Sequence, residues 1–203
     1  MVLKYTPAGS TVRIARPRIP DAEKMIRMPL DLGLRIAQPY LTPALRTEIQ
    51  QEFAPYWGRR EHPLLIANRL IDVICEKCLV DLPVEEGRRL MGRALHASFV
   101  QTPVTRVMVT AMRLASIEWI LRGIPRNFAA GNNFGSFEMA ELAPRHWRFT
   151  LDDFPAHPEV LQGFFKAGAQ ELQNDSQYQC TCISSHCYYF DITWRIGRIG
   201  GSL

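Results

Sequence analysis

The spacing of the hydrophobic residues changes once along this chain, close to Gly123. Before that point they recur at every third or fourth position, as on one face of an α-helix. After it they alternate with polar residues, as in an antiparallel strand. Helices followed by strands, one further helix and strands again predict an α+β fold. We expect the N-terminal helices to pack with an antiparallel sheet that is crossed by one helix and ends in a terminal β-hairpin.

Four helices are predicted in the first part of the chain. Threonine followed by proline, as at Thr102-Pro103, is typical of a helix N-cap and first turn. Gly123 and Pro125 predict the end of the fourth helix, because glycine favours the position beyond a helix end and proline cannot continue a helix. The predicted helices cover approximately residues 42–53, 62–79, 83–99 and 102–122.

Alternating hydrophobic and polar residues predict four antiparallel strands after Gly123. Residues 158–172 interrupt this pattern with hydrophobic residues at helical spacing, so one helix is expected between the second and third strands. The last two strands form a hairpin that turns at Ser184-Ser185. The predicted strands cover residues 134–141, 146–151, 178–183 and 187–194.

The chain of 203 residues is long enough for one hydrophobic core, and we predict a single α+β domain over residues 25–195. Three prolines interrupt residues 1–24, which predict an irregular arm with at most a short strand at Val12 and Ile14. Residues 196–203 form a glycine-rich tail.

The N-terminal arm is basic, because residues 1–20 contain four Lys and Arg side chains and no acidic one, in a chain of net charge +4. A nucleic-acid partner is not expected, because the arm carries no interleaved aromatic residues and the chain shows no recognition-helix pattern. We interpret the arm as a solvated segment, and contact with an anionic partner is the alternative.

The composition points to the cytoplasm. No hydrophobic run approaches the roughly 20 residues that a membrane-spanning helix needs, and the first residues lack the apolar centre of a signal peptide. The five cysteines are an odd number without an export signal, which favours reduced thiols over disulfides. We therefore expect a cytoplasmic protein without a transmembrane segment.

Six short motifs, in this order along residues 30–195, resemble a domain family of unknown function that is known mainly from large paralogous sets in myxobacteria and related bacteria. Each motif is short, and the specificity of the match comes from their number and order. The motifs are LPVEEGRRLMGR at 82–93, FVQT at 99–102, NNF at 132–134, ELAP at 141–144, LQG at 161–163 and ITW at 192–194.

The order of predicted elements is also similar to a superfamily of heme-nitric-oxide-binding domains, 4-vinyl-reductase-type sensor domains and vesicle-tethering TRAPP subunits. This resemblance implies a hydrophobic small molecule, lipid chain or tetrapyrrole enclosed between helices and sheet. The heme branch carries a Tyr-x-Ser-x-Arg motif for the heme propionates and a proximal histidine. Neither can be placed in this sequence, so heme is not expected.

The sharpest local chemical feature is the segment from Cys180 to Cys187. Cys180 and Cys182 would share one face of a strand, and a hairpin would set Cys182 opposite Cys187. Three thiolates completed by His186 would suit tetrahedral zinc, which is the metal-site hypothesis for this chain. The alternative, which we prefer, is that these cysteines are small buried hydrophobic residues.

No other motif indicates catalysis. Cys75 and Cys78 lie inside a helical stripe rather than at the helix start that a redox-active pair requires, so we interpret them as structural. The segment 131–135 lacks the lysine and the strand-to-helix setting of a phosphate loop, and a turn between strands is expected instead. We therefore expect a protein that is not an enzyme, although residues distant in sequence can still assemble a site.

The fourth predicted helix supplies the candidate ligand wall. If a pocket exists, a stripe of hydrophobic side chains on and before this helix would contact the ligand, whereas a plain core is the alternative interpretation. These considerations favour a small-molecule sensing or carrying domain that acts through a protein partner or as a homodimer. An assembly subunit with a filled core is the alternative. The ligand-contacting residues are predicted to be Phe99, Met108, Met112 and Trp119.

Overall fold

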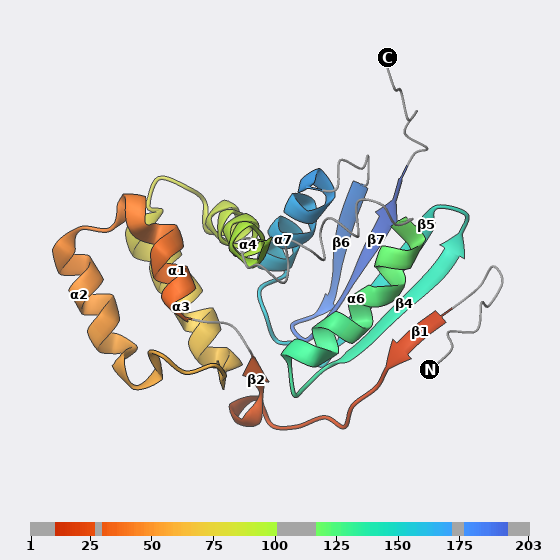
Figure 1. Ribbon diagram of the computed structural model, residues 1–203, viewed down its shortest axis with the longest axis horizontal. Helices are drawn as coiled ribbons and strands as arrows, with labels where there is room; N and C mark the ends of the chain where they lie inside the picture. Colours follow the sequence, from red (N-terminus) through yellow and green to blue (C-terminus); the bar gives the residue numbers. More distant parts are fainter. Residues whose placement is uncertain (1–10, 27–29, 101–116, 172–176, 195–203) are drawn as a thin grey trace, which may run out of the picture.

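The computed structural model describes residues 11–26, 30–100, 117–171 and 177–194 (Figure 1). Within these ranges, helices form one half of the molecule, and a five-stranded antiparallel sheet with two helices on one face forms the other half. The predicted α+β class and the terminal hairpin are confirmed.

The helical half follows the predicted start signals. The Thr42 hydroxyl accepts a hydrogen bond from the backbone N–H of Leu45 at 3.2 Å, which caps the helix that begins at Pro43. The sequence pattern missed the first helix, which has eight residues and contains Gly33, packed closely against Leu70. The helices are α1 (Leu30–Ala37), α2 (Pro43–Glu52), α3 (Leu64–Cys78) and α4 (Val84–Val100).

The sheet has the strand order β1-β4-β5-β7-β6, and every neighbouring pair is antiparallel. Helix α7 (Pro158–Glu171) connects β5 to β6, so that β6 becomes one edge of the sheet and β1 the other. Two short strands, β2 (Met25–Ile26) and β3 (His62–Pro63), pair separately. The strands of the main sheet are β1 (Thr11–Ile14), β4 (Ser136–Ala143), β5 (His146–Asp152), β6 (Gln177–Ser184) and β7 (Cys187–Thr193).

One face of the sheet forms the larger hydrophobic core. Alternate residues of β4, β5 and β7 are buried, because successive side chains of a strand point to opposite faces. Helices α6 (Ile117–Gly131) and α7 cover this face through Leu121, Phe128, Leu161 and Phe165. A second cluster lies inside the helical half and is formed mainly by α1 and α3.

Helices α4 and α7 hold the two halves together at a close backbone crossing. Gly92 of α4 faces the backbone of Val160, and Gly163 of α7 faces the backbone of Arg89. A Cβ atom on either glycine would overlap the carbonyl oxygen of the facing residue, so the crossing requires hydrogen as the side chain. Arg89 also donates from Nε to the side-chain oxygen of Gln162 at 3.0 Å across the same contact.

The predicted end of the helix before the sheet is wrong. Helix α6 continues through Gly123 and Pro125 to Gly131. Pro125 lies on the buried stripe of α6 between Leu121 and Ala129, each four residues away. Burial of the proline ring against the sheet offsets the backbone hydrogen bond that proline cannot make to Leu121.

No helix in the described ranges is long and apolar enough to cross a membrane.

The close crossing predicts that Gly163→Ala lowers the free energy of unfolding by about 3 kcal/mol, because the added methyl group forces the two helix backbones apart. Gly123→Ala is the matched control. Its nearest neighbour would lie 4.0 Å away, and alanine should raise stability by about 0.5–1 kcal/mol in a helix. Urea denaturation of the three proteins measures both effects. Equal stability of Gly163→Ala and wild type would contradict the crossing.

Candidate functional site

The N-terminal segment joins the two halves of the molecule. β1 extends the sheet beside β4, and β2 pairs with β3 directly before α3. Between these strands, residues 16–24 contact the end of α6, the end of β5 and the β6–β7 turn. We call residues 16–26 and their contacts the seam. It is the candidate functional site, because polar groups from distant parts of the sequence meet there.

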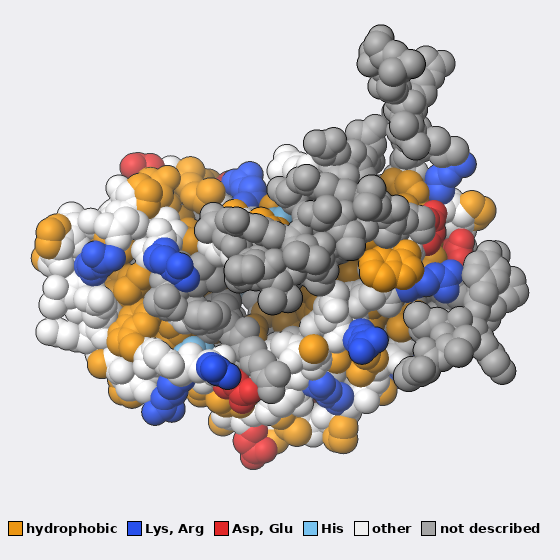
Figure 2. Space-filling model, in the orientation of Figure 1, with side chains coloured by type: hydrophobic (Ala, Val, Ile, Leu, Met, Phe, Trp, Pro, Cys, Tyr) orange, Lys and Arg blue, Asp and Glu red, His pale blue; other side chains and the backbone are white. Residues whose placement is uncertain are grey.

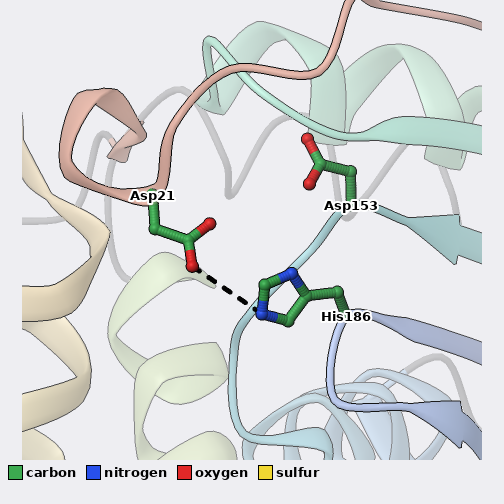
Figure 3. A group of neighbouring side chains, drawn as sticks. All are labelled: Asp21, Asp153 and His186. Carbon is green, nitrogen blue, oxygen red and sulfur yellow. Dashed lines mark ion pairs between the residues drawn. The ribbon is translucent and has the colours of Figure 1, made fainter.

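Lys24 is the centre of the seam. Its side chain is 1% exposed, and its ammonium group donates to one carboxylate oxygen of Asp21 at 2.7 Å and one of Asp153 at 2.6 Å. His186, from the β6–β7 turn, points its Nε2 toward Asp21 at 3.7 Å (Figure 3). The carbonyl oxygen of Lys24 accepts the backbone N–H of Leu64 at 2.8 Å, at the start of α3. Lys24 therefore connects the arm, the sheet and the helical half.

The backbone after β5 places one of these carboxylates. Asp153 has φ of 58°, in the left-handed region that aspartate enters more readily than most residues. The chain turns there, and the next backbone N–H, of Phe154, donates to the carbonyl oxygen of His186 at 2.9 Å. The second carboxylate oxygen of Asp153 is buried and has no hydrogen-bond partner.

The electrostatics of the seam favour a permanent ion pair. Desolvation alone would lower the pKa of Lys24, but its hydrogen bonds to Asp153 and Asp21 outweigh it and raise that pKa. The hydrogen bond from Lys24 in turn lowers the pKa of Asp21. Lys24 therefore stays charged at neutral pH, which is unsuitable for a nucleophilic or general-base lysine.

Asp21, Asp153 and His186 offer ligand atoms that all lie within 4.8 Å of one another, a spacing that could hold a metal ion. The ammonium group of Lys24, however, already bridges the two carboxylates. The protein thus supplies its own cation to this cluster, and the arrangement is a buried charge network that clasps the arm.

A cavity of about 260 Å³ lies in the seam beside the end of α6. Arg16 lines it and donates to the backbone carbonyl of Ala129 at 2.6 Å and to that of Asn132. These contacts satisfy carbonyl groups at the C-terminal end of the helix, where a positive charge is favourable. The other lining residues are Met25, Glu61, Ala130, Gly131 and Asn133.

The asparagine motif fixes the arm to the sheet. The side chain of Asn133 accepts the backbone N–H of Met25 at 2.7 Å and donates to the carbonyl oxygen of Glu23 at 3.0 Å. Gly135 has φ of 80°, as the turn chemistry predicts. The predicted setting is wrong, because this turn follows α6 rather than a strand.

The predicted ligand wall is divided. Met108 and Met112 lie outside the described residues, as does the side chain of Phe99. Trp119 is described, and 58% of it is exposed. Its prediction as an interior residue is wrong, because the buried stripe of α6 follows Leu121 and the residues four and eight positions later.

The described space between α6, α7 and the sheet is filled by aromatic rings. Phe128 contacts four of them, with ring centroids 5.2–6.3 Å apart, and these partners are Phe137, Phe149, Phe154 and Phe165. Three of the four partners are fully or almost fully buried. Such contacts are typical of a packed aromatic core.

The cysteines do not converge as predicted. A register shift sets Ser184 opposite Cys187, so that Cys182 pairs with Tyr188 instead. Paired residues share a face, and Tyr188 lies on the buried face. Cys182 therefore lies on the same side of the sheet as Tyr188, and Cys187 lies on the opposite side.

The remaining members of the predicted zinc set have other contacts. Cys180 lies on the core face opposite Phe190, and His186 faces Asp21 in the seam. In the described part of the chain, the only group of three potential metal ligands within 4.8 Å is the Asp21 cluster. The predicted zinc ligands are thus not brought together.

Burial keeps most of the thiols protonated. It raises the pKa of Cys75 to about 11 and also raises the pKa values of Cys78, Cys180 and Cys187. A thiol with a raised pKa is a poor nucleophile and a poor metal ligand at neutral pH. Cys75 and Cys78 lie in the buried stripe of α3, as expected for structural residues.

A second polar cluster connects α3, α4 and the start of α7. Arg88 donates to one carboxylate oxygen of Asp72 at 2.8 and 3.2 Å, and His157 Nε2 lies 3.1 Å from the same oxygen. Burial lowers the pKa of His157, and the opposing effect of Asp72 is smaller. His157 is therefore neutral at pH 7 in the folded protein.

The sequence gave no indication of Lys24 as a central residue. It lies in an arm predicted to be solvated, and its partner Asp153 is 129 positions away. The pair of aspartates at the end of β5 was the only local sign, because two acids directly after a buried strand are unusual for a plain turn. Contacts of this separation depend on the tertiary fold.

A family model described as a protein of unknown function (DUF2378) matches residues 37–195, and the chain belongs to this family. No curated protein gave a match.

Several solved structures share the fold at low sequence identity. An unliganded Fe(II) H-NOX protein from K. algicida is 9% identical with a TM-score of 0.61, covering 81% of this chain and 94% of its own. An Fe(II) H-NOX protein from S. oneidensis is 10% identical with a TM-score of 0.61 and coverages of 83% and 96%. The IWP-051-bound H-NOX from Shewanella woodyi in the Fe(II)CO state is 14% identical with a TM-score of 0.56 and coverages of 86% and 97%.

Replacement of the central lysine tests the seam. Lys24→Met should lower the free energy of unfolding by about 3 kcal/mol, because it leaves a buried carboxylate without its counter-charge. Lys77→Met is the control, since Lys77 pairs with Glu48 at the surface and its loss should change little. Chemical denaturation compares the two variants. Equal effects would show that the buried pair has no special weight.

The neutral state of His157 predicts a pH dependence. Its folded pKa lies below the ordinary value of 6.5, so the unfolded chain binds this proton more readily. The stability that the neutral ring contributes is present above 6.5 and is lost as the pH falls below it. His157→Gln should therefore show a smaller loss of unfolding free energy between about pH 7.5 and 5.5 than wild type. Parallel losses in both proteins would contradict a neutral His157.

Proposed function

We propose that this DUF2378 member is a non-enzymatic small-molecule sensing or carrying domain that acts through protein partners. The observation that carries the proposal is the likeness to H-NOX domains, which extends over more than nine-tenths of each of the three similar chains. Because identity is 9–14%, this likeness establishes the fold, and the function is our inference from it.

The proposed ligand is a hydrophobic molecule, such as a lipid chain or a tetrapyrrole without iron, held between the helices and the sheet. This region is lined by aromatic side chains around Phe128, which bind apolar molecules well. Phe128 itself is only partly buried, so the cluster reaches toward the surface. Contact of Phe99, Met108 and Met112 with this ligand remains a prediction from the sequence.

A filled-core assembly subunit is the second candidate. It is favoured by the packing of the same region, in which Phe137, Phe149 and Phe190 are 0% exposed and adjacent rings touch. A ligand would have to move at least one of these rings. In the second candidate none moves, and the domain contributes surfaces alone.

Protein partners are supported by the surface. Three apolar residues near the turn between α3 and α4, Val80, Leu82 and Val84, are 42–69% exposed. Contiguous exposed apolar residues of this kind often mark interaction sites. Figure 2 shows Lys and Arg scattered over the visible face rather than gathered in one patch, which agrees with the expectation that nucleic acid is not the partner.

The proposal does not include catalysis. Among the described residues, Lys24 stays charged and four thiols have raised pKa values, so neither type of group is an activated nucleophile.

Heme is not part of the proposal either, although the similar H-NOX proteins contain Fe(II). The described histidines have other surroundings: His146 faces Asp191, His157 faces Asp72 and His186 faces Asp21. The ring of His96 packs edge-on against Phe164 between α4 and α7, and His62 is fully buried beside β2. None of these settings presents a histidine to the aromatic region around Phe128.

Native mass spectrometry and solvent extraction of the purified protein test the proposal. A bound hydrophobic molecule should appear as excess mass, and re-addition at 100 times its Kd should stabilise the stripped protein by about 2.7 kcal/mol. Phe128→Trp, which fills the aromatic region, should reduce the bound fraction, whereas Trp119→Phe on the exposed side of the same helix should not. Circular dichroism confirms that both variants fold. Protein without bound mass, and without stabilisation by fatty acids or porphyrins, would favour the filled-core alternative.

A further inference from the structure

The edge strand β6 is an unprotected pairing surface. It has eight residues, QYQCTCIS, none of them charged and none a proline, and it pairs only with β7 among the described residues. Natural edge strands are usually short, charged or interrupted by proline, because an open row of backbone groups invites a further strand. The opposite edge follows this rule, since β1 has four residues and pairs Arg13 with Glu138.

The direction of the backbone groups along β7 is given by contacts at its two ends. The N–H of Trp194 donates to the carbonyl oxygen of Arg145, and the carbonyl oxygen of His186 accepts the N–H of Phe154. Both contacts are directed to the β5 side. Because these directions alternate along a strand, the odd-numbered residues of β7 direct their backbone groups toward β6.

The same alternation shows which groups of β6 face outward. Gln179 pairs with Asp191, an odd-numbered residue of β7, so the backbone groups of Gln179 face β7. Cys180 and Cys182 therefore direct their N–H and C=O groups away from the sheet. No backbone hydrogen bond joins these groups to any part of the chain that the structure describes.

We propose that β6 is a self-association surface, at which two copies of this chain pair their β6 strands antiparallel into one continuous sheet. A second copy fits because an uncharged strand meets no like-charge repulsion in its twin. The exposed Ile183, at 59%, adds apolar area beside the pair. A pairing of β6 with β6 closes as a two-fold dimer, whereas the short charged β1 does not support open-ended growth.

This inference does not depend on a ligand, and it is tested by the mass of the intact chain in solution. Sedimentation equilibrium should show a dimer for wild type. Cys182→Pro should weaken self-association at least about tenfold, because it removes one outward N–H and leaves the ladder to β7 intact. Cys182→Ala is the matched control, since it removes the same thiol and keeps the N–H. It should dimerise as wild type does.

Hydrogen exchange of the wild-type protein provides a test without any variant. Amides in residues 177–184 should exchange more slowly at high protein concentration than at low concentration, while those of residues 11–14 in the other edge strand should not change. A monomer at all concentrations, a dimer that Cys182→Pro leaves intact while folded, or exchange in β6 that is independent of concentration would each overturn the proposal.

Discussion

The close crossing of α4 and α7 is the contact on which the two halves of this protein depend. Two helix backbones meet there with glycine on each side, at Gly92 and Gly163, and no larger side chain fits. The crossing has two consequences. It positions α7 over the sheet that follows it, and it brings the helical half close enough for the N-terminal segment to reach both halves.

The seam depends on this arrangement. Lys24 can bridge Asp21 and Asp153 only because the end of β5 and the start of α3 lie beside the arm. A buried ion pair of this kind adds little net stability compared with an apolar contact, but it penalises any arrangement that separates the charges. It therefore specifies how the arm lies more than how stable the domain is.

The fold places different roles in different regions. The aromatic region around Phe128 is the proposed ligand region, whereas the seam fixes the arm and the β6 edge faces outward. The thiols, which were the most conspicuous chemical groups in the sequence, are mostly buried with raised pKa values. Their placement agrees with the interpretation of cysteines as small hydrophobic residues better than with a metal centre.

The sequence by itself determined the α+β class, the starts of α2, α3 and α4, and the four strands after Gly135, because hydrophobic period and helix caps are local properties. It misjudged Pro125, Trp119 and the hairpin register, since a buried proline ring, the face of a helix and a one-residue register shift depend on what packs against them. Only the tertiary structure decided that Lys24 is buried. Its partner Asp153 lies 129 residues away, and no local pattern records a contact made by the folding of the whole chain.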